Sequence, residues 1–251
     1  MTDIRVSLRK NGWAKVNSVF TRDETDELAS LANHLAEKQA LHADKPVLID
    51  ESETGKFSPR KLAEPFFQSP RFRQTLFSQK IAQLINPIVG PGADLLFDHV
   101  FMKPSLFGAK KHWHQDGYYY DISPPENGIT VWIALCNAHE ENGCLRYIQG
   151  SHKLGLLPHT QPGGNPALVQ VSLENVDLEK SVAVPANRGD VILHHYHALH
   201  GSGPNLSSES RIAYASHWLG KDSTGAGASW HKTYPLREQY WQLIKTESLK
   251  L

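Results

Sequence analysis

Several features that would point to a specialised class of protein are scarce or missing. Only two cysteines, Cys136 and Cys144, occur in 251 residues, too few for a disulfide framework, so a reducing cytoplasm is the expected location. No run approaches the roughly 18 apolar residues that a membrane-spanning helix needs. Residues 1–16 also lack the apolar core of a signal peptide. These absences predict a cytoplasmic protein that crosses no membrane.

An excess of charge of either sign is missing as well. Lysine plus arginine number 26, aspartate plus glutamate also number 26, and the formal net charge is zero. Proteins that bind nucleic acids or anionic membranes usually carry a basic stripe or patch. We therefore expect neither nucleic acid nor a membrane as a partner. Hydrophobic residues at 40% and charged residues at 21% are typical of a folded globular domain.

The beginning of the chain has the pattern of helices. Thr21 followed by Glu24 fits a capping box, and apolar residues recur after it at helical spacing. Ser69-Pro70 resembles a cap followed by proline at the first helical position. The apolar pattern that follows predicts a helix that stops at Pro87 or Gly90.

The remainder of the chain has the pattern of strands. Short β-rich runs are separated by turn residues, at 95–102, 129–136, 144–148, 182–184, 191–195 and 212–218. Asn142-Gly143, between two of these runs, predicts a hairpin because both positions tolerate positive φ. Many short strands joined by Pro/Gly-rich connections favour a double-sheet jelly roll or a barrel over an alternating α/β fold.

The organisation that follows is a single domain over residues 1–251, mainly β with flanking helices. A helical layer covers about 1–92, a jelly-roll core of the double-stranded β-helix or cupin-like type covers about 93–220, and a C-terminal extension covers 221–251. The length of the chain is sufficient for one large core.

Histidine is abundant, with 14 in the chain, and it is the commonest metal ligand. In the run His114-Gln115-Asp116, the imidazole and the carboxylate lie two positions apart, so an extended strand points both to one face. With a second histidine from a distant strand they would form a facial triad, which suits iron(II) and leaves positions open. A hydrogen-bonded His–Asp pair at a strand end explains the same tripeptide.

A second histidine-rich run follows a predicted strand and contains His194, His195, His197 and His200. Successive side chains of a strand point to opposite faces, so these histidines would be distributed over both faces. Their positions alone do not show which of them binds a metal. Further on, Arg211 begins an apolar run, and a buried guanidinium needs an anionic partner. A carboxylate of a dicarboxylate such as 2-oxoglutarate would match the paired N–H donors of the guanidinium. An internal salt bridge with an aspartate or a glutamate would also neutralise the charge.

Several segments in this order resemble the phytanoyl-CoA dioxygenase family, a branch of the iron(II)/2-oxoglutarate-dependent oxygenases. The resemblance spans roughly residues 97–218. The segments are HWHQD at 112–116, VWIAL at 131–135, ENGCL at 141–145, GSHK at 150–153, GD at 189–190, and HGSG at 200–203 with Arg211. The resemblance implies that iron(II) is bound by three side chains, namely His114, Asp116 and His200.

The resemblance also implies that Arg211 binds the distal carboxylate of 2-oxoglutarate and acts with the metal ligands in catalysis. It places Ser202, Trp132 and Lys103 beside the same co-substrate. The implied activity is a dioxygenase that uses O2 and hydroxylates a small molecule, with release of succinate and carbon dioxide. Related halogenases have glycine or alanine in place of Asp116, so the carboxylate favours hydroxylation here.

Substrate contacts are expected among aromatic residues near the ligand strand, and the candidates are Trp113, Tyr118, Tyr120 and Trp218. We expect a monomer or a homodimer. Two other functions fit the residues. One is a non-catalytic jelly-roll protein that binds a metal or an organic acid, and the other is a cupin-type metal oxygenase that does not use 2-oxoglutarate.

Overall fold

The computed structural model describes residues 3–41, 49–51, 54–55, 57–164, 168–172, 174 and 176–248. The α-helices are α1 (Ile4–Asn11), α2 (Arg22–Leu41), α3 (Pro65–Gln68), α4 (Pro70–Leu76), α5 (Gln79–Val89), α6 (Gly117–Tyr120) and α7 (Trp230–Ser248). The strands are β1 (Trp13–Val16), β2 (Ile49–Glu51), β3 (Phe57–Pro59), β4 (Lys61–Ala63), β5 (Asp94–Lys103), β6 (Lys111–His114), β7 (Ile122–Ser123), β8 (Gly128–Ala134), β9 (Leu145–Ile148), β10 (His159–Thr160), β11 (Gln170–Val171), β12 (Ser181–Val184), β13 (Val191–His195), β14 (His200–Ser202), β15 (Arg211–Leu219) and β16 (Thr224–Gly225).

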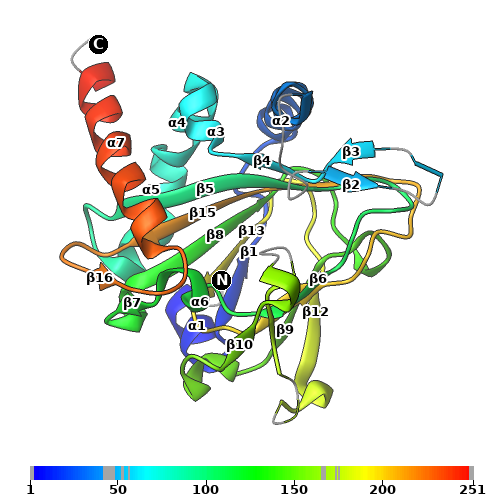
Figure 1. Cartoon of the computed structure of the whole chain (residues 1–251). Coiled ribbons are helices and arrows are strands. Elements are labelled where there is room, and N and C mark those ends of the chain that lie inside the picture. The colour runs from blue at the N-terminus through cyan, green and yellow to red at the C-terminus, as the bar shows by residue number, and fades with distance from the viewer. Residues whose placement is uncertain are drawn as a thin grey trace.

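Two antiparallel sheets form the core, as the jelly-roll prediction requires. The larger sheet has six strands in the order β1-β13-β8-β15-β5-β4, and the smaller has four in the order β12-β9-β14-β6. In Figure 1 helices α2, α3, α4 and α7 lie above the six-stranded sheet, and the four-stranded sheet lies below it. The expected helical layer also supplies β1 and β4, which are the two edge strands of the larger sheet.

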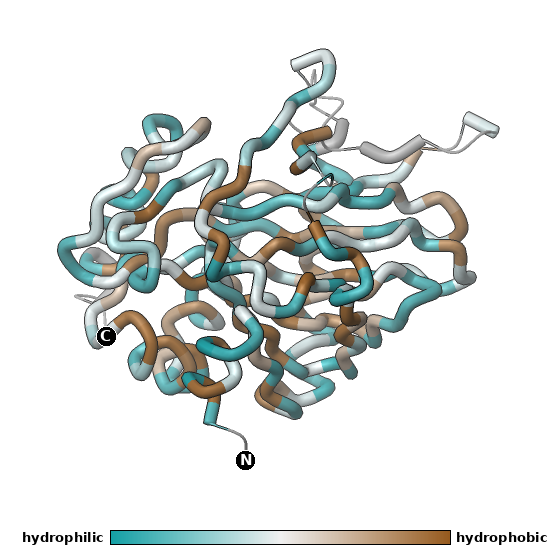
Figure 2. Tube along the Cα trace, turned by 90° about the horizontal axis from the view of Figure 1, so that it is seen from below, coloured by the Kyte–Doolittle hydropathy of each residue, from teal (hydrophilic) through white to brown (hydrophobic). Residues whose placement is uncertain are grey.

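Alternation along the strands of the larger sheet creates its two apolar faces. On β8, Val131 and Ile133 pack into the cluster shared with the helices, whereas Trp132 and Ala134 face the cluster between the two sheets. All seven residues of β8 are buried, because each face of this central strand is covered. Figure 2 shows hydrophobic residues gathered along the strands and packed helices, with hydrophilic residues in many of the connecting loops.

Asp98 on β5 ties two helices to the larger sheet. Its carboxylate accepts hydrogen bonds from the Phe66 backbone N–H of α3 at 3.0 Å, from the Tyr214 hydroxyl of β15 at 2.8 Å, and from the Tyr240 hydroxyl of α7 at 3.1 Å. Burial raises the pKa of this carboxyl to about 7, although the three donors act in the opposite direction.

The predicted helix caps are present. The Thr21 backbone N–H donates to the Glu24 carboxylate at 2.7 Å, and the Glu24 N–H donates to the Thr21 hydroxyl. Ser69 caps α4 as expected. The prediction of one helix after Ser69 was wrong, because Ser78 caps a separate helix, α5. That helix contains Pro87 and ends at Val89, with Gly90 as its cap.

The hairpin predicted at Asn142-Gly143 is also absent. Strand β8 belongs to the six-stranded sheet, and β9 belongs to the four-stranded sheet, so the connection crosses between sheets. Asn142 ends a short 3-10 helix, and Gly143 follows it with a φ of 82°. The backbone at Gly143 therefore does adopt a positive φ, which glycine tolerates. The positive φ ends a short helix and does not form a hairpin turn.

Candidate active site

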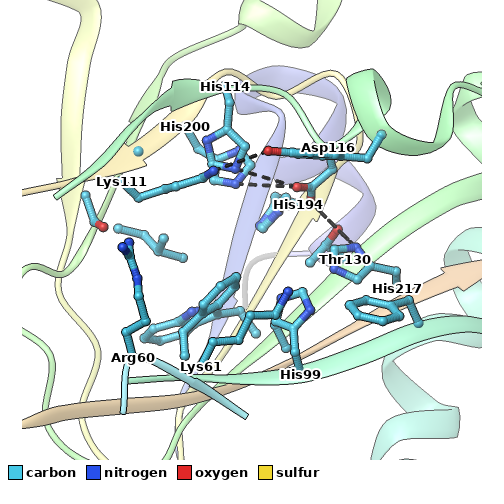
Figure 3. A pocket seen from close by; sticks show the side chains of 18 of the residues that line it. Arg60, Lys61, His99, Lys111, His114, Asp116, Thr130, His194, His200 and His217 are labelled. Atoms are coloured by element: carbon cyan, nitrogen blue, oxygen red, sulfur yellow. Dashed lines mark hydrogen bonds and ion pairs between the residues drawn. The ribbon is translucent and has the colours of Figure 1, made fainter. Parts of the chain in front are cut away.

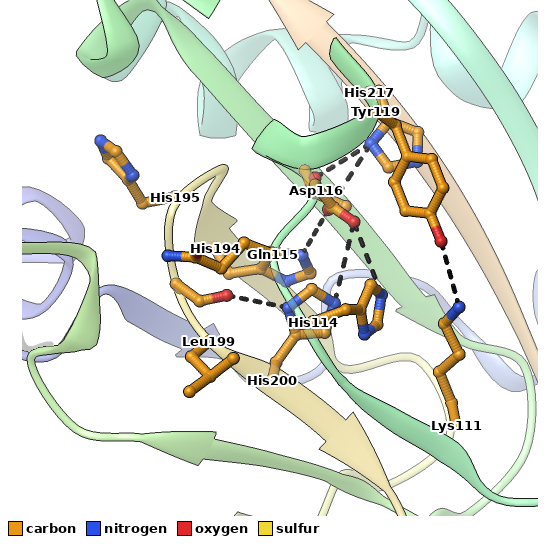
Figure 4. A network of polar contacts seen from close by, with 12 residues as sticks. Lys111, His114, Gln115, Asp116, Tyr119, His194, His195, Leu199, His200 and His217 are labelled. Carbon is orange, nitrogen blue, oxygen red and sulfur yellow. Dashed lines mark hydrogen bonds and ion pairs between the residues drawn. The ribbon is translucent and has the colours of Figure 1, made fainter. Parts of the chain in front are cut away.

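Three potential metal ligands converge where β6 ends and β14 begins. His114 ends β6 and His200 begins β14, and the two are direct partners across the antiparallel pair. Asp116 follows two residues after His114, where the chain turns into α6. The Asp116 Oδ1 lies 3.9 Å from the Nε2 atom of each histidine. Figure 4 shows the two imidazoles directed at this carboxylate, and the three ligand atoms lie within 4.8 Å of one another.

Backbone carbonyls orient both imidazoles. The Nδ1 of His114 lies 2.8 Å from the His112 carbonyl oxygen, and the Nδ1 of His200 lies 2.9 Å from the Ala198 carbonyl oxygen. A carbonyl only accepts, so each Nδ1 carries the proton and each Nε2 keeps a lone pair. Ligating histidines in metalloproteins are held in this way. Both Nε2 atoms therefore face Asp116 in the form that binds a cation.

The second oxygen of Asp116 is held by hydrogen bonds. The Thr130 hydroxyl donates to Oδ2 at 2.6 Å, and the Nε2 of His194 lies 3.0 Å from the same oxygen. His217 in turn contacts the Thr130 hydroxyl through Nδ1 at 3.0 Å, and the Tyr147 hydroxyl lies 2.9 Å from Nδ1 of His194. These contacts fix the carboxylate, while Oδ1 faces the two histidines.

The protonation states of the three groups also suit a cation. Burial lowers the pKa of His114 well below its usual value and lowers the pKa of His200 to about 4. Burial alone would raise the pKa of Asp116, but His200 and the hydrogen bond from His194 outweigh it and hold that pKa well below its usual value. At neutral pH the site therefore holds two neutral imidazoles and one carboxylate. Two nitrogens and one hard oxygen suit iron(II).

A cavity of about 370 Å³ opens from the three ligands into the space between the sheets. Its walls include all four residues predicted to contact the co-substrate, which are Lys103, Trp132, Ser202 and Arg211. A cavity of this size is at the small end of those that bind small molecules.

Arg211, the first residue of β15, is buried with 4% of its surface exposed. Among the described residues, nothing accepts a hydrogen bond from its Nε or Nη1. Its guanidinium carbon lies 5.8 Å from the centre of the Trp132 ring, and burial lowers the pKa of Arg211 to about 10. The internal salt bridge considered from the sequence does not form among the described residues, and the unpaired N–H groups are available to an anion.

Lys103 and Ser202 line the cavity, and their contact with 2-oxoglutarate stays a prediction. Lys103 pairs with Arg211 across β5 and β15, and its ammonium group donates to the Ala109 carbonyl oxygen. Ser202 is buried on β14, two residues after His200. Both residues therefore line the same cavity as the three predicted metal ligands.

The substrate candidates divide into two groups. Tyr120 lines the cavity. Trp113, Tyr118 and Trp218 are not among the described residues that line the cavity, and their role as substrate contacts stays a prediction. Trp113 and Trp218 point to the opposite face of their strands from His114 and His217 respectively, where they pack against apolar side chains. Tyr118 lies in α6, not in a continued strand, and it stacks on His159.

Sequence reasoning missed several polar residues of the cavity wall, including Arg60, Lys61, His99 and His217. Lys111 also lines the cavity. Strand alternation places positions 111 and 114 on opposite faces, but the register between β6 and β14 shifts between His200 and Ser202. Such a bulge re-aims side chains, and no feature of the sequence predicts it.

None of the helices in the part of the chain that the structure describes combines the length and apolar character needed to cross a membrane.

The chain is similar to known proteins in both sequence and structure. The sequence model of the phytanoyl-CoA dioxygenase (PhyH) family matches residues 8–213. A phytanoyl-CoA dioxygenase domain-containing protein 1 homolog of Caenorhabditis briggsae is 26% identical, covering 95% of this chain and 96% of the relative. A probable alpha-ketoglutarate-dependent hypophosphite dioxygenase of Stutzerimonas stutzeri is 26% identical, covering 81% of this chain and 74% of the relative.

Solved structures agree on the fold. EvdO2 from Micromonospora carbonacea, crystallised with 2-oxoglutarate, superimposes with a TM-score of 0.68 at 22% identity, covering 91% of this chain and 93% of EvdO2. The match of the family model over most of the chain decides the assignment. The chain belongs to the phytanoyl-CoA dioxygenase family and is a 2-oxoglutarate-dependent non-haem iron enzyme.

Proposed function

We propose that the protein hydroxylates a small organic molecule, with release of succinate and carbon dioxide. His114, Asp116 and His200 would hold iron(II), and Arg211 would bind the distal carboxylate of 2-oxoglutarate. The observation that carries this proposal is the convergence of two Nε2 atoms on one oxygen of Asp116, 3.9 Å from each. In the same cavity lies the buried Arg211, whose Nε and Nη1 have no partner among the described residues.

Each part of the cavity has a role in this reaction. His114, Asp116 and His200 would hold the ion and would leave coordination positions for co-substrate and oxygen. When bound there, iron and 2-oxoglutarate supply the oxidising chemistry. Arg211 orients the co-substrate through a bidentate contact with its carboxylate. Thr130 and His194 keep Oδ2 of Asp116 engaged, so that Oδ1 stays directed at the ion.

Enclosure of the site supports the same chemistry. The three ligands are buried, with exposed fractions of 5% for His114 and 6% each for Asp116 and His200. Exclusion of water strengthens the electrostatic contacts to bound anions. It also keeps the reacting groups away from solvent, which limits side reactions.

The test combines anaerobic spectroscopy with turnover. Iron(II) and 2-oxoglutarate added without oxygen should produce a visible charge-transfer band, and a panel of metabolites with oxygen should then reveal substrate-stimulated succinate formation. Asp116→Ala should abolish hydroxylation, because the ion loses its only carboxylate ligand. A cupin-type oxygenase that does not use 2-oxoglutarate would give no band, and full hydroxylation by Asp116→Ala in a halide-free assay would contradict the ligand assignment.

A further inference from the structure

A histidine outside the cavity contacts the chain between two of the predicted metal ligands. His159, the first residue of β10, accepts a hydrogen bond through Nε2 from the backbone N–H of Gln115 at 3.0 Å. Gln115 is the residue that separates His114 from Asp116. In Figure 3 His114, Asp116 and His200 lie together on one side of the cavity, and His159 is not among the described residues that line it. His159 therefore reaches the metal-binding segment from outside the cavity.

The contacts of His159 fix its proton and its orientation. Its Nδ1 lies 2.7 Å from the Leu157 carbonyl oxygen, and a carbonyl only accepts, so Nδ1 carries the proton and Nε2 keeps a lone pair. Burial lowers the pKa of His159 below its usual value, so the neutral ring that accepts from Gln115 is the main form at neutral pH. The ring also stacks on Tyr118, with 4.7 Å between the ring centres. The imidazole is therefore held both at its edge and on its face.

The place of Gln115 in the fold explains why a side chain accepts this hydrogen bond. Strand β6 ends at His114 and is the outermost strand of the four-stranded sheet, with β14 on its inner side. Beyond the end of an edge strand, a backbone N–H that points outward has no partner in the ladder. Gln115 is fully buried, and a buried N–H without an acceptor is costly. His159 supplies the acceptor that the sheet does not.

The loop that carries His159 also holds the side chain of Gln115. The Oε1 of Gln115 accepts from the Leu157 backbone N–H at 2.7 Å, and its Nε2 donates to the Gly155 carbonyl oxygen at 2.8 Å. Nε2 also donates to the His197 carbonyl oxygen at 2.7 Å. Residues 155–159 thus bind the backbone nitrogen and both polar side-chain atoms of Gln115. These contacts restrain the peptide on which the two flanking ligands depend for their direction.

Small rotations of this peptide would disturb the metal site. The Asp116 Oδ1 lies 3.9 Å from the Nε2 of His114 and from that of His200, and the ion would bind among these three atoms. Because His114 and Asp116 lie on either side of Gln115, a rotation there would move one ligand atom relative to the other. Groups that orient metal ligands typically change metal affinity by about 10- to 100-fold.

We propose that His159 is a positioning residue for the metal site, which acts through the backbone of Gln115 to hold His114 and Asp116 at the separation that an ion needs. This inference rests on the ligand assignment of the proposed function and adds to it a residue outside the cavity. Tyr118 supports the imidazole on its face, so that Nε2 stays directed at the Gln115 N–H.

The test is a titration of the full chain with cobalt(II), followed through the visible absorption of the bound ion. Cobalt(II) accepts the same nitrogen and oxygen ligands as iron(II). His159→Phe keeps a ring that can stack on Tyr118 but has no acceptor, whereas His159→Gln keeps an acceptor for the Gln115 N–H but has no ring. We expect the dissociation constant to rise about 10- to 100-fold in His159→Phe, with a changed absorption spectrum. His159→Gln should restore most of the affinity and the wild-type spectrum.

Controls separate the acceptor from other effects. His34→Phe makes the same chemical change at an exposed position of α2 outside the cavity, and it should bind cobalt(II) like wild type. Circular dichroism and thermal unfolding verify that the variants fold. His159→Leu, which also lacks an acceptor, replaces His159→Phe if that variant does not fold.

The inference is overturned if folded His159→Phe keeps the wild-type affinity and spectrum, or if His159→Gln loses as much affinity as His159→Phe. In either case, cobalt(II) binding by the wild type that Asp116→Ala abolishes would leave the proposed function intact. If the wild type does not bind cobalt(II), or if Asp116→Ala binds it equally well, the ligand assignment fails and the proposed function fails with it.

Discussion

Replacing Arg211 by methionine removes the guanidinium and keeps a flexible apolar side chain in its buried position. In the free protein nothing among the described residues accepts from Nε or Nη1 of Arg211, so the change breaks no observed contact at those atoms. The consequence should therefore appear when 2-oxoglutarate binds. Loss of one partner of a buried, hydrogen-bonded charge pair costs about 2–5 kcal/mol. The dissociation constant for 2-oxoglutarate should then rise roughly 30- to 5,000-fold.

The same structure predicts an opposite effect on the free protein. A buried guanidinium whose Nε and Nη1 have no acceptor among the described residues destabilises the fold, so Arg211→Met should melt at or above the wild-type temperature when no ligand is present. The added stability that 2-oxoglutarate gives to the wild type should largely disappear in the variant. Arg211→Lys keeps the charge but lacks the fork, so its affinity should lie between the two.

The assay is an anaerobic titration of the iron(II)-loaded protein with 2-oxoglutarate, followed through the charge-transfer band. Arg146→Met serves as the matched control, because Arg146 pairs with Glu140 at 2.8 Å outside the cavity. The control should bind 2-oxoglutarate with wild-type affinity. An unchanged dissociation constant in Arg211→Met would refute the reasoning and remove Arg211 from the site.

Three further predictions test the surroundings of the site and the fold. Thr130→Val removes the donor to Oδ2 of Asp116 without changing shape and should weaken iron(II) binding about 10- to 100-fold in a metal competition assay. The pKa of Asp98 is raised from 3.8 to about 7. Between these two pH values the folded protein keeps a proton on Asp98 that the unfolded chain releases. The contribution of Asp98 to the free energy of unfolding therefore falls as the pH rises from about 4 to 7. Asp98→Asn should therefore show a smaller loss of thermal stability between pH 4 and 7 than the wild type, and equal slopes would contradict the raised pKa. Gly189 has a φ of 87°, and a Cβ atom at this position would overlap the Phe20 carbonyl oxygen. Gly189→Ala should therefore lower the free energy of unfolding, measured by urea denaturation, by about 1–3 kcal/mol or more.

Local sequence signals predicted local structure well. The capping box of Thr21 and Glu24 and the cap at Ser69 need only neighbouring residues, and both are present. The run after Ser69 did not reveal the break at Ser78, because apolar spacing continues across two consecutive helices. Likewise, Asn142-Gly143 marked a positive φ correctly, but it did not show that its two flanking strands lie in different sheets.

The metal ligands could be narrowed from the sequence only with help from the family resemblance. The alternation of side chains along a strand did not identify which of the four clustered histidines binds the metal. In the structure these histidines differ in the groups that they contact. His200 faces Asp116 Oδ1, His194 contacts Oδ2, and His195 lies on the other face of its strand beside His152. The assignment of roles to these side chains stays a prediction until a metal is bound.

The cavity wall was the least predictable part. Lys61 lies more than fifty residues before His114 in the chain and reaches the site through the pairing of β4 with β5. Lys111 reaches it through a bulge, and Thr130 contacts Asp116 through the packing of one sheet on the other. Each of these contacts depends on long-range register, which a single sequence does not specify.

The measurement that tests the central claim most directly is a crystal structure obtained without oxygen from protein soaked with iron(II) and 2-oxoglutarate, with anomalous diffraction at the iron edge. We predict one anomalous peak within ligand distance of the Nε2 atoms of His114 and His200 and of the Asp116 Oδ1, with the distal carboxylate of 2-oxoglutarate at Arg211. An iron peak elsewhere, or 2-oxoglutarate turned away from Arg211, would contradict the account.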